Sequence, residues 1–313
     1  MTSAPYIDGL DRADLPPRPL HLAIGMFDGV HLGHRAVVEA AVQSARGASG
    51  LGGVLTFWPH PSALFRPENP TRVMQSAAIK SRMLRALGVE TVIIQPFTTE
   101  LASVCGEEFL PWLKQRLPRL VAVYVGENFR FGQGRKGDVA LLVQEGRKHG
   151  VRVFSAPRVN LDGEPISSTR IRAQLEAGDM PAANALLGYN YFAEGVVTGG
   201  KRLGRTIGFP TLNVPWSPEF RPRLGVYAVR VSGAKSPAAL PAVANYGVRP
   251  TVENTSEPRL EVHVLGDCPF GEGDAVTVEW LRFLRPELKF ANLEELRAQI
   301  GRDRAAAAEF FTA

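Results

Sequence analysis

Short apolar runs alternate with amphipathic segments through the first half of the chain, and this alternation limits the possible folds more than any other feature. Between the runs lie segments such as SAAIKSRMLRALG and DVALLVQEGRKHG, whose apolar residues recur at three- and four-residue steps. The pattern predicts βαβ units in a Rossmann-like α/β domain, with a parallel sheet that binds ligands at the carboxyl ends of its strands. The apolar runs, between Leu20 and Pro157, are LHLAIG, GGVLTF, TVIIQPF, LVAVYVG and VRVFSAP.

The periodicity changes near residues 188–192. The stretch SSTRIRAQLEAGDMPAANALLGYNYF predicts two short helices, and from Ala193 onward alternating runs between Gly and Pro turns predict a small antiparallel barrel or sandwich. The final segment, NLEELRAQIGRDRAAAAEFF, predicts a terminal helix packed against that barrel. We therefore predict two domains, residues 1–187 and 188–313. The apolar stripe expected on the terminal helix consists of Leu293, Leu296, Ile300 and Phe310.

Composition narrows the class of protein. The 313 residues are 45% hydrophobic and 21% charged, which argues against a disordered chain or a membrane protein. A net charge of +5 favours anionic partners without choosing among nucleotides, nucleic acid and lipid. Cys105 and Cys268 are expected to be small buried residues in a reducing compartment. With no visible secretory signal or membrane-length apolar run, we expect a cytoplasmic protein.

A strand-to-helix turn with two histidines is the first candidate site. The turn MFDGVH precedes a helix expected from Gly33 to Arg46, and Gly29 and Gly33 permit unusual dihedrals and close backbone approach. The free N–H groups of a helix start attract phosphate, and His31 and His34 would share one side of the first turn. There they can stabilise charge on phosphate oxygens. On spacing alone, one histidine could equally cap the helix while the other is buried.

The segment GMFDGVHLGH resembles the GxFDGxHxGH signature of the nucleotidyltransferase superfamily, whose members attack the α-phosphate of a nucleoside triphosphate and release pyrophosphate. ISSTRIR, residues 166–172, resembles the second signature, ISSTxIR. Alone, its three hydroxyl residues would also suit an ordinary helix N-cap. The resemblance implies catalytic roles for His31, His34 and Arg172, and nucleotide-binding roles for Gly25, Phe27, Asp28, Gly29, Gly33, Ser167, Ser168 and Thr169.

Two further blocks fall where strand ends should gather. LTFWPHP and GENFRFGQGRKGD resemble the TFxPHP and GxNFxFGxxxxG blocks in the adenylyltransferase half of bacterial bifunctional riboflavin kinase/FAD synthetases. The resemblance gives Asn128 a role in the flavin and nucleotide site and suggests that Phe129 and Phe131 line the flavin pocket. Without the resemblance, this aromatic and basic loop is also typical of single-stranded nucleic-acid binding.

The second candidate site is GKRLGRTIGFPTLNV, residues 200–214. Gly200, Gly204 and Gly208 recur every four residues and leave the backbone room to fold around phosphate. Thr211 and Asn213 are two residues apart, so in an extended segment they offer oxygen ligands to one Mg²⁺. The alternative is a proline turn in which threonine and asparagine make only local hydrogen bonds.

This stretch resembles the GxxxGxPTxN motif of flavokinases, which make FMN by phosphorylating riboflavin with MgATP, and Lys201 falls in its phosphate-binding part. The resemblance continues through GVYAV, NYGVRPT, LEVHVLG and RFLRPELKFANLEELRAQIGRD. Glu261 falls on the position of the family's catalytic base, although a lone glutamate on an alternating strand is more often just outward-facing. The sequence departs from the flavokinase pattern at two places. Leu212 stands where the family usually has alanine, and the loop 267–274 is shorter than is general in the family.

Together these blocks predict a bifunctional enzyme. Riboflavin and ATP would give FMN at the C-terminal site, and FMN and ATP would give FAD and pyrophosphate at the N-terminal site. We expect Mg²⁺ at both sites, ATP as co-substrate and no nucleic-acid or membrane partner; the oligomeric state stays open. Two other classes were weighed: a single-activity transferase with a regulatory barrel, and a nucleic-acid-binding protein whose affinity would fall steeply with salt.

Overall fold

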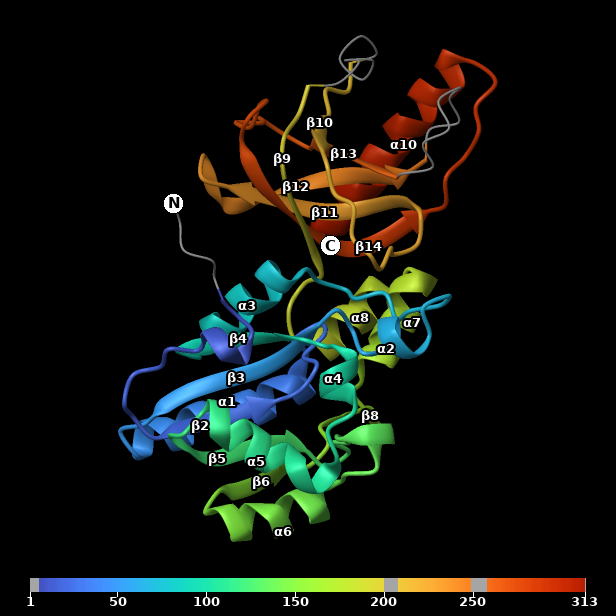
Figure 1. The fold of residues 1–313 in the computed structure, drawn as a ribbon. Helices are drawn as coiled ribbons and strands as arrows, with labels where there is room; N and C mark the ends of the chain where they lie inside the picture. The colour runs from blue at the N-terminus through green and yellow to red at the C-terminus, as the bar shows by residue number, and fades with distance from the viewer. Residues whose placement is uncertain (1–5, 200–207, 249–257, 313) are drawn as a thin grey trace. The chain divides into compact units, whose positions relative to one another are not determined.

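The computed structural model describes residues 6–199, 208–248 and 258–312. The chain forms two compact units, Met1–Ser168 and Thr169–Ala313. Each unit has its own sheet, and the two are described separately below (Figure 1).

The first unit contains a six-stranded parallel sheet in the order β1-β4-β3-β2-β5-β6. The five predicted strands are confirmed, and the short edge strand β1 was not predicted. From β2 the chain adds β3 and β4 on one side, then returns to place β5 on the other side. The strand order therefore reverses between β2 and β5, where ligands of open α/β sheets bind. The strands are β1 (Ile7–Asp8), β2 (Leu20–Ile24), β3 (Leu51–Trp58), β4 (Thr91–Pro96), β5 (Leu120–Gly126) and β6 (Arg152–Ala156).

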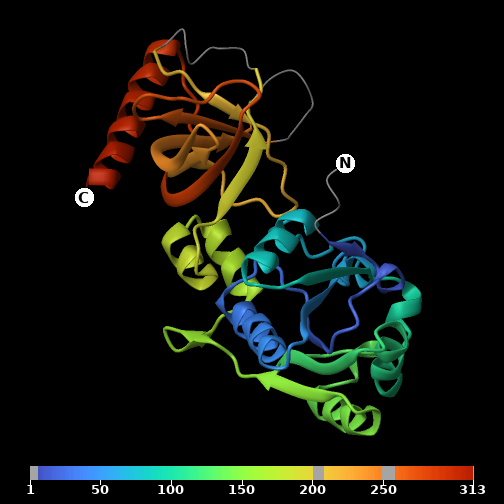
Figure 2. The same ribbon diagram turned by 90° about the vertical axis from the view of Figure 1, so that its left-hand side faces the viewer.

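Helices cover both faces of this sheet (Figure 2). Neighbouring residues of β2 belong to cores on opposite faces of the sheet. Leu22 lies in the same core cluster as Leu110 and Leu142, whereas Ala23 lies in the cluster of Val38 and Leu84. Burial on both faces explains why the strands are continuous apolar runs. The helices are α1 (Leu32–Gly47), α2 (Ser62–Phe65), α3 (Ala77–Ala86), α4 (Thr99–Ala102), α5 (Gly106–Arg116) and α6 (Val139–His149), with 3-10 turns at Leu10–Arg12 and Gln133–Arg135 and a small hairpin of β7 (Asn160–Leu161) and β8 (Glu164–Pro165).

The second unit is a nearly closed antiparallel barrel in the order β10-β13-β12-β11-β14-β9. A bridge between Thr198 and Asn213 joins the two edges of this sheet. Its interior is filled by packed aromatic rings, among them Tyr227, Tyr246 and Trp280. The predicted barrel and both short helices are confirmed. The elements are α7 (Ser168–Ala177), α8 (Met180–Leu187), β9 (Phe192–Val196), β10 (Leu212–Val214), β11 (Gly225–Gly233), β12 (Ser236–Gly247), β13 (Arg259–Val264), β14 (Ala275–Arg285) and α10 (Leu293–Thr312).

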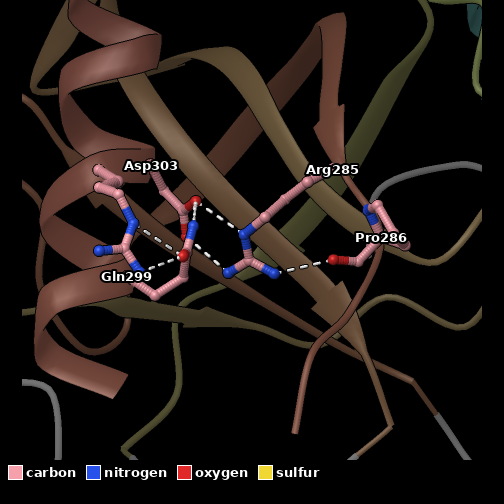
Figure 3. Close-up of polar contacts among 5 residues, drawn as sticks. Arg285, Pro286, Gln299 and Asp303 are labelled. Atoms are coloured by element: carbon pink, nitrogen blue, oxygen red, sulfur yellow. Dashed lines mark hydrogen bonds and ion pairs between the residues drawn. The ribbon is translucent and has the colours of Figure 1, made fainter. Parts of the chain in front are cut away.

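The terminal helix α10 packs on the outside of the barrel, as predicted. Leu293 is 57% exposed, whereas Leu296, Ile300 and Phe310 are partly buried, so the expected stripe is confirmed from Leu296 onward. The buried positions, Asp303 and Ala307, belong to the same helix face. Arg285 at the end of β14 donates from Nε and Nη2 to the two carboxylate oxygens of Asp303, at 2.7 and 2.6 Å (Figure 3). A hydrogen-bonded ion pair therefore anchors this helix in addition to the apolar contact of Ala307 and Phe310 with the barrel.

Both cysteines are exposed and free, so the expectation that they are buried is wrong. Cys105 stands at the N-cap of α5, and Cys268 lies in the loop after β13. Helix caps and loops lie at surfaces, and composition alone does not show that a cysteine occupies one. Among the described residues, no helix is long and apolar enough to cross a membrane.

Candidate active sites in the two units

The turn after β2 lies at the point where the strand order reverses. Its backbone is left-handed at Phe27 (φ 49°), Gly29 (φ 85°) and Val30 (φ 38°). The prediction of unusual dihedrals is confirmed for Gly29 but wrong for Gly33, which lies inside α1. Phe27 and Val30 are buried, so packing holds two side-chain-bearing residues in a conformation that costs free energy. Such strain is typical of backbone shaped for a ligand.

His31 and His34 stack at the start of α1. Their ring centroids are 3.5 Å apart with planes inclined by 17°. His31 is the N-cap residue, and its Nδ1 accepts a hydrogen bond from the backbone N–H of His34 at 3.3 Å. In the neutral imidazole the proton therefore sits on Nε2, which makes that nitrogen a donor. The expected shared face is confirmed, and so is the capping role that spacing alone left open.

The surroundings keep His34 neutral. Burial holds the pKa of His34 well below its usual 6.5, and the nearby charges of His31 and Lys80 lower it further. The rings of His34 and Phe27 lie edge to face, with their centroids 5.4 Å apart. Among the described residues, its buried Nδ1 has no hydrogen-bond partner. His34 therefore contributes a neutral ring to the stacked pair.

Lys80 on α3 lies beneath this turn, and no sequence pattern indicated its place there. The side chain is 2% exposed. Its Nζ donates to the carbonyl oxygen of Met26 at 3.0 Å and to Oγ1 of Thr56 at 3.2 Å, and Thr56 in turn donates to Met26. A lysine in an amphipathic helix usually belongs to the solvated face. Here it places a positive charge under the turn and fixes its backbone.

Asp28 and Ser168 join the two signature motifs. The Oγ of Ser168 donates to the carbonyl oxygen of Asp28 at 2.9 Å, across 140 positions of sequence. The buried Asp28 also accepts from the backbone N–H of Met74 through Oδ1 at 2.9 Å. Ser168 begins α7, and Arg172 follows one turn later on the same helix. The structure therefore brings the start of ISSTRIR to the turn that contains the histidines.

The segment after β5 lies on the other side of the reversal point. Oδ1 of Asn128 accepts from Nη2 of Arg158 at 2.5 Å, and Nε of Arg158 pairs with Glu127 at 2.9 Å. The ring of Phe129 is partly buried and stacks on Phe131 at 5.6 Å. Phe131 is 6% exposed and belongs to the core of the unit. Of the two phenylalanines, only Phe129 is available to a ligand at the surface.

In the second unit, Asn213 of β10 lies directly opposite Glu261 of β13. Both are half-buried between fully buried neighbours, so both face the outside of the barrel. His263 shares that face, as expected, and its Nδ1 donates to the carbonyl oxygen of Pro210 at 2.8 Å. His263 thus holds the chain where it enters β10, immediately before Thr211. The predicted metal ligand and the predicted base are neighbours across the sheet.

The remaining expectations for the barrel fall on loops. Gly208 has a left-handed backbone (φ 86°), whereas Gly200, Lys201 and Gly204 lie outside the described residues. In the short loop, Asp274 accepts from Nζ of Lys235 at 2.7 Å, and this bond lowers the pKa of the Asp274 carboxyl. The described residues contain no cluster of three or more His, Cys, Asp or Glu suited to a metal.

Comparisons with known proteins identify the two parts of the chain. A family model for FAD synthetase matches residues 15–170, and one for riboflavin kinase matches residues 187–311. A protein of Escherichia coli K12, named bifunctional riboflavin kinase/FMN adenylyltransferase, is 39% identical over 290 residues, covering 93% of this chain and 92% of its own. Its counterpart of the same name in Haemophilus influenzae is 35% identical over 306 residues, covering 97% and 98%.

A solved structure shares the whole fold. The crystal structure described as a macrolide-efflux protein from Streptococcus pneumoniae superposes with a TM-score of 0.85 at 27% identity, covering 97% of this chain and 98% of that one. Both family models lie in the order that the motifs predicted, and the curated relatives match along nearly their full length. This chain belongs to the family of bifunctional riboflavin kinase/FMN adenylyltransferases.

Proposed function

We propose that this enzyme makes FAD in two steps at two separate sites. The second unit transfers the γ-phosphoryl group of ATP to riboflavin, giving FMN and ADP. The first unit transfers the adenylyl group of a second ATP to FMN, giving FAD and pyrophosphate. The observation that carries the proposal is the pair of domains in this order, each with a polar site at a sheet. We place the domain boundary at residues 187/188, after α8.

For adenylyl transfer, we propose a mechanism of positioning and charge stabilisation. A phosphate oxygen of FMN attacks the α-phosphorus of ATP, and the bond to the bridging oxygen of the leaving pyrophosphate breaks. The FMN phosphate is already ionised near pH 7, so no general base is needed. The Nε2–H of His31, the N–H groups at the start of α1 and the guanidinium of Arg172 stabilise the growing negative charge. Neutral His34 keeps the His31 ring in place by stacking.

The substrates of this step would occupy the reversal point of the sheet. The phosphates of ATP lie against the turn formed by Gly25, Phe27, Asp28, Gly29 and Gly33, and against Ser167, Ser168 and Thr169. FMN approaches from the β5 side, where Asn128 and Phe129 are exposed enough to contact it. The burial of Phe131 supports a packing role for that ring, behind Phe129.

For riboflavin phosphorylation, the nucleophile is a neutral alcohol, so a base helps. Glu261 takes the proton of the ribityl 5′-hydroxyl as the oxygen attacks the γ-phosphorus and ADP leaves. Asn213 and Thr211 would hold the Mg²⁺ of MgATP, with Gly208 near the phosphates. When bound, Mg²⁺ neutralises charge on the phosphate oxygens. The position of Asn213 opposite Glu261 supports the idea that metal and base serve one reaction.

One incubation tests both steps. The purified protein receives riboflavin, ATP and Mg²⁺, and the flavins are separated by chromatography over time. We expect FMN to appear first and FAD afterwards, whereas a parallel reaction that starts from FMN should yield FAD without a lag. Conversion of FMN to FAD with no conversion of riboflavin would reduce the barrel to a regulatory role, and the absence of both products would refute the proposal.

A further inference from the structure

A third polar residue lies in line with the two proposed for the kinase. On the side of β13 away from β10, Asn245 of β12 lies directly opposite Glu261. Asn213 lies opposite Glu261 on the other side. The three residues therefore form one row across three adjacent strands, with the carboxylate between two amides.

The row faces one side of the sheet. Asn245 is half-buried, like Glu261, and stands between the buried residues Ala244 and Tyr246. Directly opposite residues in an antiparallel pair have Cβ atoms about 4.5–5.5 Å apart, which short polar side chains can span. An asparagine amide offers two N–H donors, and an ionised carboxylate only accepts. Asn245 is thus placed to orient the carboxylate that acts as the base.

The backbone around Asn245 is held on both sides. Gly247 follows Asn245 by two residues on β12, and a Cβ at Gly247 would collide with the carboxylate of Glu287. The backbone N–H of Val248 donates to that carboxylate at 3.4 Å. Across β11, Val226 pairs with both Asn245 and Arg285, and Arg285 forms the ion pair with α10. Asn245 therefore belongs to a continuous row that ends in the anchored helix.

We propose that Asn245 is a positioning residue for riboflavin phosphorylation, which aims the carboxylate of Glu261 at the substrate hydroxyl. The inference rests on the proposed role of Glu261 as the base. The residues opposite Glu261 are uncharged amides. Charged or titratable groups on its face include Arg259 and His263 on the same strand and Glu287 over Gly247 on β12. Further along the row, Arg285 of β14 is paired with Asp303 of α10.

The test measures kcat and KM of riboflavin phosphorylation in the full chain. Asn245→Ala should lower kcat about tenfold with little change in KM, because orientation of the base is lost while the substrate sites remain. Asn245→Asp should lower kcat at least as much, because a second carboxylate cannot donate to that of Glu261, and Asn245→Ser should restore part of the rate with its hydroxyl donor.

Three controls separate this role from structural damage. Conversion of FMN to FAD by the first unit should stay unchanged in every variant. Thr277→Ala removes a half-buried polar side chain from the same barrel surface on β14 and should leave kcat and KM of riboflavin phosphorylation unaltered. Glu261→Gln should lower kcat at least about 100-fold, as expected for loss of a general base.

The outcomes distinguish the two claims. If Glu261→Gln loses activity while the Asn245 variants keep the wild-type kcat, the positioning role is overturned and the base role stands. A rise in KM with kcat unchanged would also overturn it, because Asn245 would then only bind substrate. An undiminished kinase rate in Glu261→Gln would instead remove the base itself, and the inference with it.

Discussion

The backbone N–H of His34 donates to Nδ1 of His31, and this one bond gives His31 two tasks. It caps the first turn of α1, and it fixes the remaining proton on Nε2, where a phosphate oxygen can receive it. The stacked ring of His34 then limits how His31 can turn. Helix stability and adenylyl transfer therefore depend on the same imidazole, and substitutions can separate the two.

Two substitutions of His31 should differ in stability but not in activity. Asparagine is a good N-cap and alanine is not, so His31→Asn should keep the melting temperature close to wild type while His31→Ala loses about 1 kcal/mol. Both lack the Nε2–H donor, so FAD formation should fall about 100-fold or more in each. Calorimetry and flavin chromatography would measure these effects. Riboflavin phosphorylation serves as the control, and an equal loss of both activities would contradict separate sites.

The neutral state of His34 should be visible in a histidine titration by NMR. Burial lowers the pKa of His34 well below 6.5, and the pKa of His21 is also lowered by burial. The imidazoles of His34 and His21 should therefore stay neutral to a lower pH than a free imidazole, and His34→Asn should remove one of these two signals. His34 binds a proton less readily in the folded state than in the unfolded state. With respect to this group, the free energy of unfolding is therefore highest above about pH 6.5 and decreases as the pH falls below that value. An imidazole of His34 that titrates near 6.5 would contradict this environment.

Lys80→Met should impair adenylyl transfer and destabilise the first unit. The substitution removes two hydrogen bonds from a charged donor, to Met26 and Thr56, each of which contributes about 1.5–3 kcal/mol, whereas the bond from Thr56 to Met26 remains. It also removes a positive charge beneath the phosphate-binding turn. Arg82→Met is the matched control, since it deletes an exposed cation two residues further along α3. Equal FAD formation by the two variants would show that Lys80 has no influence on the site.

Local pattern predicted the elements and the order of both domains because each strand is buried on the faces that its sequence pattern indicates. Lys80 was missed because its helix has an ordinary amphipathic pattern, and only tertiary packing reveals that this position faces inward. The left-handed backbone at Phe27 and Val30 was missed for a similar reason: packing of the buried side chains overrides their intrinsic preference for negative φ.

The register of the barrel strands could not be predicted from the sequence either. Period-2 alternation predicted that Glu261 faces outward, but it contains no information on which residue of another strand lies opposite. The pairing of Glu261 with Asn213 and Asn245 emerges only once the barrel is closed. Motif resemblance located the separate blocks, and the fold brought them into one row.

Asn213→Ala should weaken the use of Mg²⁺ by the kinase. Loss of one oxygen ligand should raise the Mg²⁺ concentration that gives half-maximal phosphorylation of riboflavin, and added Mg²⁺ should restore part of the rate. FAD formation from FMN should keep its wild-type Mg²⁺ dependence, because that site lies in the other unit. Titration of both activities with Mg²⁺ at fixed ATP makes the measurement. An unchanged Mg²⁺ requirement would exclude Asn213 as a metal ligand.

The anchor between Arg285 and Asp303 should be strongly coupled. The two side chains are 18% and 8% exposed, and Gln299 also donates to Asp303 (Figure 3). Arg285→Met or Asp303→Leu alone should destabilise the second unit by about 3–5 kcal/mol, since each leaves a buried charge without its partner. The double variant should recover much of that loss, because no unpaired charge remains. A double-mutant cycle from urea unfolding of the second unit, followed by its tryptophan fluorescence, would measure the coupling, and additive losses would contradict a direct pair.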